Sequence, residues 1–159
     1  PSFVEQLTAI CSSYHISPRY MQIEVTERVH DMEGLDIKYL ISKLRQAGFT
    51  VAIDDFGTEY ANLALLSEVE FDVLKLDILF FQKSRDIRRE RIVVSNVINM
   101  AKELDIKTIA EGVEDMDTVE FLRKAGCNVI QGYVFAKPMP QEDFEHLLTD
   151  NQDGSFEGC

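Results

Sequence analysis

Acidic side chains and one lysine recur at the ends of short apolar runs in this sequence. The run Val51-Ala52-Ile53 leads directly into Asp54 and Asp55. The polar residues that close the five runs are Glu24 with Glu27, Asp54 with Asp55, Lys75 with Asp77, Glu111 with Glu114, and Gln131. Short β-branched runs are typical of buried strands, whereas charged groups are costly to bury. The pattern therefore indicates strands that deliver polar groups to a shared functional edge.

These residue types suit a divalent cation and a phosphodiester. Carboxylates from several strands are the hard oxygen ligands that magnesium and manganese prefer. Adjacent acids such as Asp54 and Asp55 can serve two ions about 4 Å apart, with one carboxylate bridging them. Two such ions activate a water, neutralise phosphoryl oxygens and stabilise the leaving oxygen.

Lys75 has three interpretations that the sequence leaves open. The lysine could orient the attacking water or stabilise charge at such a metal site. It could instead form a buried ion pair with a neighbouring acid. In a third interpretation it is the Schiff-base nucleophile of a different barrel enzyme.

Asp55-Phe56-Gly57 also matches the Asp-Phe-Gly magnesium motif of protein kinases. A kinase needs a glycine-rich loop and a His-Arg-Asp catalytic loop before that motif, and both are absent from the 159 residues. The chain is also too short for two kinase lobes. The kinase interpretation is therefore rejected.

Apolar spacing predicts helices and strands in alternation. Helices are expected over about residues 3–10, 37–44, 63–69, 88–104, 115–125 and 141–148, and strands over 21–27, 49–53, 73–77, 106–112 and 128–135. Five strand-helix units require parallel strands with helical crossovers, an α/β fold whose strands end at one face. Residues 1–150 are expected to form one domain, and residues 151–159, without any period, a disordered tail.

Composition excludes several classes of function. The net charge is −12, with 16 basic and 28 acidic residues, which argues against binding to DNA or RNA. No apolar run approaches the roughly 18 residues of a membrane span, so no membrane contact is expected. Three scattered cysteines and three isolated histidines predict neither disulfides nor zinc, and favour a cytoplasmic location.

Five motifs in order resemble one known family. They are "IEVTE", "AIDDFGTEY", "LKLD", "IAEGVE" and "QGYVFAKP", and together they resemble the EAL domain, the cyclic di-GMP phosphodiesterase of bacterial second-messenger signalling. The resemblance covers about residues 1 to 148. It implies a modified (β/α)8 TIM-type barrel that uses two metal ions, Mg2+ or Mn2+, to hydrolyse cyclic di-GMP to the linear dinucleotide.

The resemblance also implies a role for each residue of the edge. Glu24 and Asp54 would hold one metal, and Asp55 and Glu111 the second. Glu111 would also be the general base, and Lys75 would position the attacking water. The residues with supporting or ligand-contacting roles are Glu27, which would steady the loop after Asp55, and Asp77, Glu114 and Gln131.

The sequence departs from the family by what it lacks. The Glu-Ala-Leu segment with its ligating glutamate, and a following strand with a ligating asparagine, do not occur in it. A whole barrel takes roughly 250 residues. The expectation is therefore the C-terminal portion of an EAL barrel, incomplete with about five βα units, which hydrolyses little by itself. Its open sheet edge would be covered by a homo-oligomer or by the upstream barrel half of the same protein, with a GGDEF or sensor domain further upstream.

A second departure lies in the loop after Asp55. The family favours Gly-Tyr-Ser-Ser where this chain has Glu59-Tyr60-Ala61-Asn62. A glutamate resists backbone angles that a glycine adopts freely, and it adds negative charge beside a phosphate site. The alternative function is thus a degenerate EAL domain that acts as a cyclic di-GMP receptor or a protein-interaction module.

Overall fold

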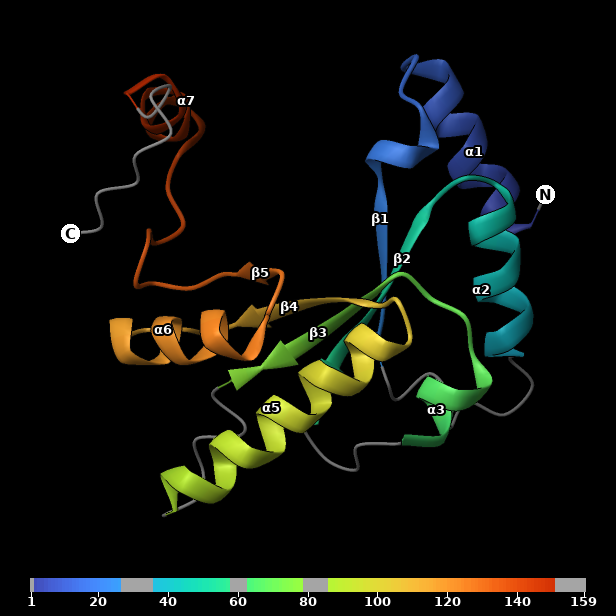
Figure 1. The fold of residues 1–159 in the computed structure, drawn as a ribbon. Coiled ribbons are helices and arrows are strands. Elements are labelled where there is room, and N and C mark those ends of the chain that lie inside the picture. Colours follow the sequence, from blue (N-terminus) through green and yellow to red (C-terminus); the bar gives the residue numbers. More distant parts are fainter. Residues whose placement is uncertain (1, 27–35, 58–62, 79–85, 151–159) are drawn as a thin grey trace.

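Five parallel strands form a single sheet at the centre of the protein (Figure 1). The computed structural model describes residues 2–26, 36–57, 63–78 and 86–150. The strands follow each other in chain order: β1 (Gln22–Thr26), β2 (Thr50–Phe56), β3 (Val73–Asp77), β4 (Lys107–Glu111) and β5 (Val129–Ile130). The predicted α/β fold with five parallel strands is confirmed.

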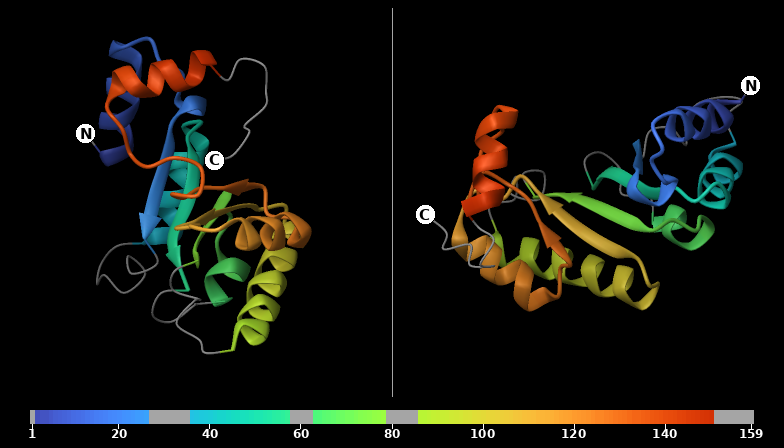
Figure 2. Two further views of the ribbon diagram at one scale, coloured as in Figure 1. Left: turned by 90° about the vertical axis from the view of Figure 1, so that its left-hand side faces the viewer. Right: turned by 90° about the horizontal axis from the view of Figure 1, so that it is seen from above.

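Helices separate the strands and lie at both ends of the sheet. The helices are α1 (Phe3–Ser13), the 3-10 turn η1 (Pro18–Tyr20), α2 (Ile37–Gln46), α3 (Leu63–Glu68), α5 (Ile87–Glu103), α6 (Met116–Ala125) and α7 (Gln141–Asp150). The sheet curves, α5 and α6 run along its outer side, and α1 and α7 stand at its opposite ends (Figure 2). Among the described residues, no helix is both long and apolar enough to cross a membrane.

Short polar residues start most of these helices. Ser2 and Glu5 form a capping box at α1, with each side chain bonded to the other's backbone N–H. Asp36, Asp86 and Asp115 cap α2, α5 and α6 by accepting from backbone N–H groups of the first turn. Such caps satisfy donors that the first turn leaves without a partner, so each helix begins at a defined residue.

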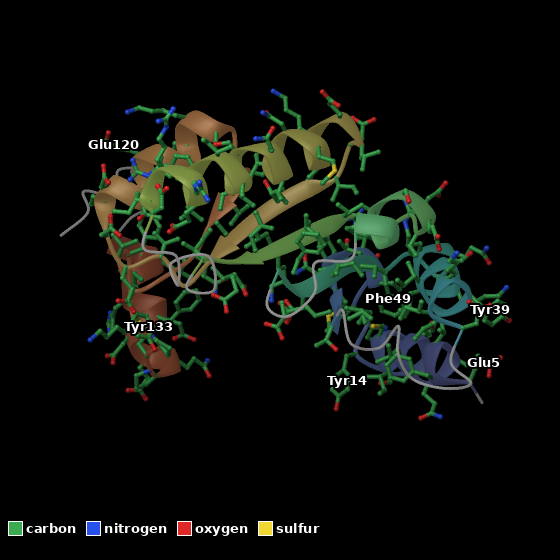
Figure 3. All side chains as sticks on the ribbon, turned by 90° about the horizontal axis from the view of Figure 1, so that it is seen from below. Glu5, Tyr14, Tyr39, Phe49, Glu120 and Tyr133 are labelled. Atoms are coloured by element: carbon green, nitrogen blue, oxygen red, sulfur yellow. The ribbon has the colours of Figure 1, made fainter. Side chains whose placement is uncertain are left out.

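One hydrophobic core joins the sheet to the helices around it. Its fully buried members include Leu74 and Leu76 of β3, Leu44 of α2 and Leu122 of α6. Phe49 lies between α2 and the sheet, whereas Tyr39 and Glu5 point outward from α2 and α1 (Figure 3). The core therefore fixes the strands from one side of the sheet.

Two strand boundaries differ from the predictions. The strand expected to stop at Ile53 continues through both aspartates to Phe56, because a β-bulge admits them into the pairing with β3. The strand expected over 128–135 has only two residues, Val129 and Ile130, and the chain then turns. The turn after β5 bonds back to Val113: the Val113 N–H donates to the carbonyl of Gln131, and the Val134 N–H to the carbonyl of Val113. The expected tail, residues 151–159, lies outside the described residues.

Candidate functional site

Strand geometry places four of the predicted residues on one side of the sheet. Side chains alternate between the two faces of a strand. In β3, Leu74 and Leu76 enter the core, so Lys75 between them points to the opposite face. Glu24, Asp54 and Glu111, from β1, β2 and β4, reach that same lysine.

The Lys75 ammonium is the centre of the site. Its Nζ lies 2.8 Å from Oε1 of Glu24, 3.0 Å from Oδ1 of Asp54 and 3.2 Å from Oε1 of Glu111. The lysine side chain is only 8% exposed, whereas the three acids are 44%, 20% and 27% exposed. The ammonium therefore lies at the base of the cluster, and the carboxylates extend from it toward solvent.

The charge of Lys75 is held firmly. Burial lowers the pKa of the lysine, but hydrogen bonds to Glu24, Asp54 and Glu111 outweigh burial and raise it well above the ordinary value. The ion-pair interpretation of Lys75 thus describes its contacts in this structure. A Schiff-base nucleophile needs a neutral amine, and a raised pKa works against that role.

Glu111 has a carboxyl whose pKa is raised, chiefly by burial. Burial raises the pKa of its carboxyl, Lys75 lowers it, and the nearby negative charges of Asp54 and Glu24 raise it further, with a net upward shift. A carboxylate with a raised pKa binds a proton more readily, so it is a better base. Three carboxylates share one ammonium, so two negative charges remain uncompensated.

The adjacent aspartates owe their arrangement to a β-bulge. Between Ile53 and Phe56, β2 has one residue more than the facing stretch of β3, from Leu74 to Leu76. Asp55 adopts the left-handed conformation with φ +57°, a region that glycine, asparagine and aspartate tolerate better than other residues. Its N–H donates to Oδ1 of Asp54 over 3.0 Å. Asp54 can therefore face Lys75 while Asp55 next to it stays exposed at the strand end.

The segment after Glu111 is held by a close backbone contact that sequence reasoning missed. A Cβ added to Gly132 would lie 2.0 Å from the carbonyl oxygen of Val113 and 2.4 Å from its nitrogen. Only glycine permits this approach, which fixes the chain two residues beyond Glu111. The glycine of "QGY" could have indicated this close backbone approach, but we predicted a continuous strand there.

Asp77, Glu114 and Gln131 occupy further positions at the ends of β3 and β4 and after β5. Asp77 lies opposite Glu111 in the β3–β4 register, and Gln131 is tied to β4 by its backbone N–H, 2.8 Å from the carbonyl of Ala110. The side chains of Glu114 and Gln131 are exposed. Glu27 and the loop with Glu59 lie outside the described residues. The roles predicted for these side chains remain predictions.

The donor set fits a divalent cation in chemistry and in charge. It consists of hard carboxylate oxygens from three strands, with two negative charges in excess. Within residues 2–26, 36–57, 63–78 and 86–150, no three acidic, histidine or cysteine side chains are already grouped as a metal site. The lysine occupies the point that the three carboxylates share, so a cation would have to draw oxygens away from the ammonium.

Comparison with known proteins gives one consistent result. The profile of the EAL domain family matches residues 1–138. The chain is 37% identical over 141 residues to the probable cyclic di-GMP phosphodiesterase PdeB of Escherichia coli, and this match spans 87% of the chain and 26% of PdeB.

Solved structures agree with the sequence match. The EAL domain of DcpA from Mycobacterium smegmatis superposes with a TM-score of 0.82 at 30% identity, over 93% of this chain and 66% of that domain. BlrP1 of Klebsiella pneumoniae, in its complex with manganese and cyclic di-GMP at pH 6, gives 0.77 at 31% identity, over 87% of this chain and 35% of BlrP1. The fold, the residues at the strand ends and the family profile all lead to the same assignment: the chain belongs to the EAL domain family.

Proposed function

We propose that this domain hydrolyses cyclic di-GMP to the linear dinucleotide at the cluster around Lys75. The proposal rests on one observation above all: carboxylates from β1, β2 and β4 converge on one buried lysine at the edge where active sites of such sheets lie. The relatives support the substrate, since PdeB is named a probable cyclic di-GMP phosphodiesterase and BlrP1 was solved with that dinucleotide.

Each residue of the cluster has a task in this proposal. Glu24 and Asp54 would hold one divalent cation, Mg2+ or Mn2+, and Asp55 with Glu111 a second. The cations would lower the pKa of a bound water and neutralise the phosphoryl oxygens. Glu111 would accept the proton of the attacking water, a role suited to its raised pKa. Lys75 would donate an N–H to that water or to a phosphoryl oxygen.

Turnover of cyclic di-GMP by the native protein that carries this domain tests the proposal. Chromatography should show the linear dinucleotide in the presence of Mg2+ or Mn2+, and Asp54→Asn should abolish it. Asp72→Asn is a matched control, because Asp72 binds Arg45 and the N–H of Val51 away from Lys75. Near-normal turnover by Asp54→Asn would contradict the assignment of the site. Binding of cyclic di-GMP without turnover would favour the receptor function instead.

We further propose that the 159 residues by themselves hydrolyse little. The family's Glu-Ala-Leu segment does not occur in them, and in the described structure β1 and β5 each pair on one side only. The chain spans about a quarter of PdeB, which supports a regulatory neighbour such as a GGDEF or sensor domain. Clear turnover of cyclic di-GMP by the 159 residues alone would contradict this proposal.

A cytoplasmic location remains our proposal. It is supported by the free thiols of Cys11 and Cys127, because free cysteines are typical of reducing compartments.

A further inference from the structure

The hydrogen-bonding capacity of Lys75 is used up by the acids around it. An ammonium has three N–H donors and no acceptor. Three carboxylate oxygens, one each from Glu24, Asp54 and Glu111, lie within 3.2 Å of this nitrogen. In this arrangement the lysine has no N–H left for a water or a phosphoryl oxygen. The task that the proposed function gives to Lys75 therefore requires that it first release at least one carboxylate.

The same carboxylates are those that would bind a cation. Carboxylate oxygens bind Mg2+ at about 2.0–2.1 Å around one centre, a geometry that they do not reach while they share the ammonium. A cation and the lysine therefore compete for the same oxygens. The two excess negative charges of the cluster favour the entry of a divalent cation, and the oxygens it takes leave the lysine.

We propose that Lys75 is the counter-ion of the three carboxylates and holds Glu24, Asp54 and Glu111 together without metal. When a divalent cation binds, the lysine releases a carboxylate, which frees an N–H for substrate. The inference rests on the proposed metal-dependent function and extends it. In this inference an N–H of Lys75 is available to substrate only when the cation is bound. Cation binding and release of the lysine are therefore coupled. Because such coupling is reciprocal, removal of the lysine must change the affinity for the cation.

Two substitutions separate this role from a merely structural one. Lys75→Met removes the ammonium and keeps much of the buried chain, whereas Lys107→Met removes a lysine from β4 whose side chain is exposed. Without metal, Lys75→Met should melt at a lower temperature than the unchanged protein, because three carboxylates then face one another unpaired. Added Mn2+ should raise its melting temperature more than that of the unchanged protein. Lys107→Met should have the melting temperature of the unchanged protein, both without metal and with Mn2+.

Calorimetric titration with Mn2+ gives the decisive comparison. Lys75→Met should bind the ion more tightly, on the order of tenfold, since a competing unit charge has been removed from beside the ligands. Equal or weaker binding by a folded Lys75→Met would overturn the inference and leave the proposed function standing. If neither protein binds Mn2+ or Mg2+, the metal chemistry of the proposed function and the inference that rests on it both fail.

A measurement on the unchanged protein keeps the test valid if Lys75→Met does not fold. The Nζ resonance of Lys75 can be followed by NMR of lysine labelled with nitrogen-15, while diamagnetic Mg2+ is added. The inference requires that this resonance shift and that its protons exchange faster with water as Mg2+ binds. A Lys75 resonance that stays unchanged while calorimetry shows Mg2+ binding would overturn the inference.

Discussion

At the scale of single residues, Asp55 is both a proposed metal ligand and a residue with a positive φ angle. Its φ of +57° belongs to a region that asparagine and aspartate tolerate but β-branched residues avoid. The β-bulge at this position lets two consecutive aspartates occupy one strand end.

Substitutions at Asp55 should therefore separate stability from activity. We expect Asp55→Val to lower the free energy of unfolding by roughly 1–2 kcal/mol, because a β-branched residue is strongly disfavoured at positive φ. Asp55→Asn and Asp55→Gly should unfold much like the unchanged protein, since both residues tolerate this conformation. In the native protein that carries this domain, all three variants should lose cyclic di-GMP turnover. Urea unfolding together with the turnover assay checks this, and an unaffected stability of Asp55→Val would argue against the positive φ at this position.

The residue scale also shows how far the sequence could predict the site. Glu24, Asp54, Lys75 and Glu111 were predicted to converge because parallel strands end at one edge. The contact of all three carboxylates with Nζ of Lys75 could not be predicted, since it depends on strand register and on side-chain rotamers. The bulge at Asp55 was also missed, because its sequence pattern resembles that of an ordinary strand end.

At the scale of elements, Gly132 joins the turn after β5 to the segment that follows β4. A side chain at this position would collide with backbone atoms of Val113, and backbone cannot move aside as a flexible side chain can. The strand predicted over residues 128–135 was too long, because only Val129 and Ile130 pair with β4 and the chain then turns. Apolar residues of the "VIQGYVF" run pack beside a turn instead of within a ladder, and hydrophobic periodicity does not distinguish the two.

Gly132→Ala should thus be strongly destabilising. We expect a loss of at least about 2 kcal/mol in the free energy of unfolding, as for an overpacked core. Gly126→Ala is the matched control: it has φ +89° but open space around an added Cβ, so it should lose only about 1 kcal/mol. Chemical denaturation measures both, and equal losses in the two variants would contradict the close contact.

The cap of α6 allows a prediction on pH. Asp115 accepts from the N–H and the hydroxyl of Thr118, both at 2.8 Å, and these bonds lower the pKa of its carboxyl below the ordinary 3.8. The cap therefore stabilises the protein above about pH 4, and its contribution is lost as the pH falls through the lowered value.

Asp115→Ala should consequently reduce the free energy of unfolding by about 1 kcal/mol near neutral pH. The difference from the unchanged protein should shrink in strong acid, where the carboxyl is protonated in both states. Asp115→Asn keeps a capping oxygen but no charge. Near neutral pH its free energy of unfolding should lie between that of the unchanged protein and that of Asp115→Ala. A difference that grows toward acid would contradict the sign of the shift.

At the scale of the whole molecule, the sheet is open in the described structure. β1 pairs only with β2, and β5 pairs only with β4. Unpaired edges and apolar side chains such as Val129 and Tyr133, both about half exposed, favour association with further strands. Among the described residues, α5 and α6 lie along the outer side of the sheet (Figure 2).

We therefore expect the 159-residue chain to self-associate in solution. Light scattering coupled to gel filtration should give a molar mass above the 18.2 kDa of one chain. A surface lysine in the edge strand opposes such pairing, so Val129→Lys should shift the mass toward one chain. A well-folded monomer of the unchanged chain would contradict this expectation.

The measurement that tests the central claim most directly is calorimetric titration of Mn2+ into the unchanged protein and into Asp54→Asn, with Asp72→Asn as control. The claim is that the carboxylates gathered around Lys75 form a divalent-cation site. It predicts saturable binding by the unchanged protein and by Asp72→Asn, and an affinity at least tenfold weaker for Asp54→Asn. Equal affinities of all three proteins, or no binding by any of them, would contradict it.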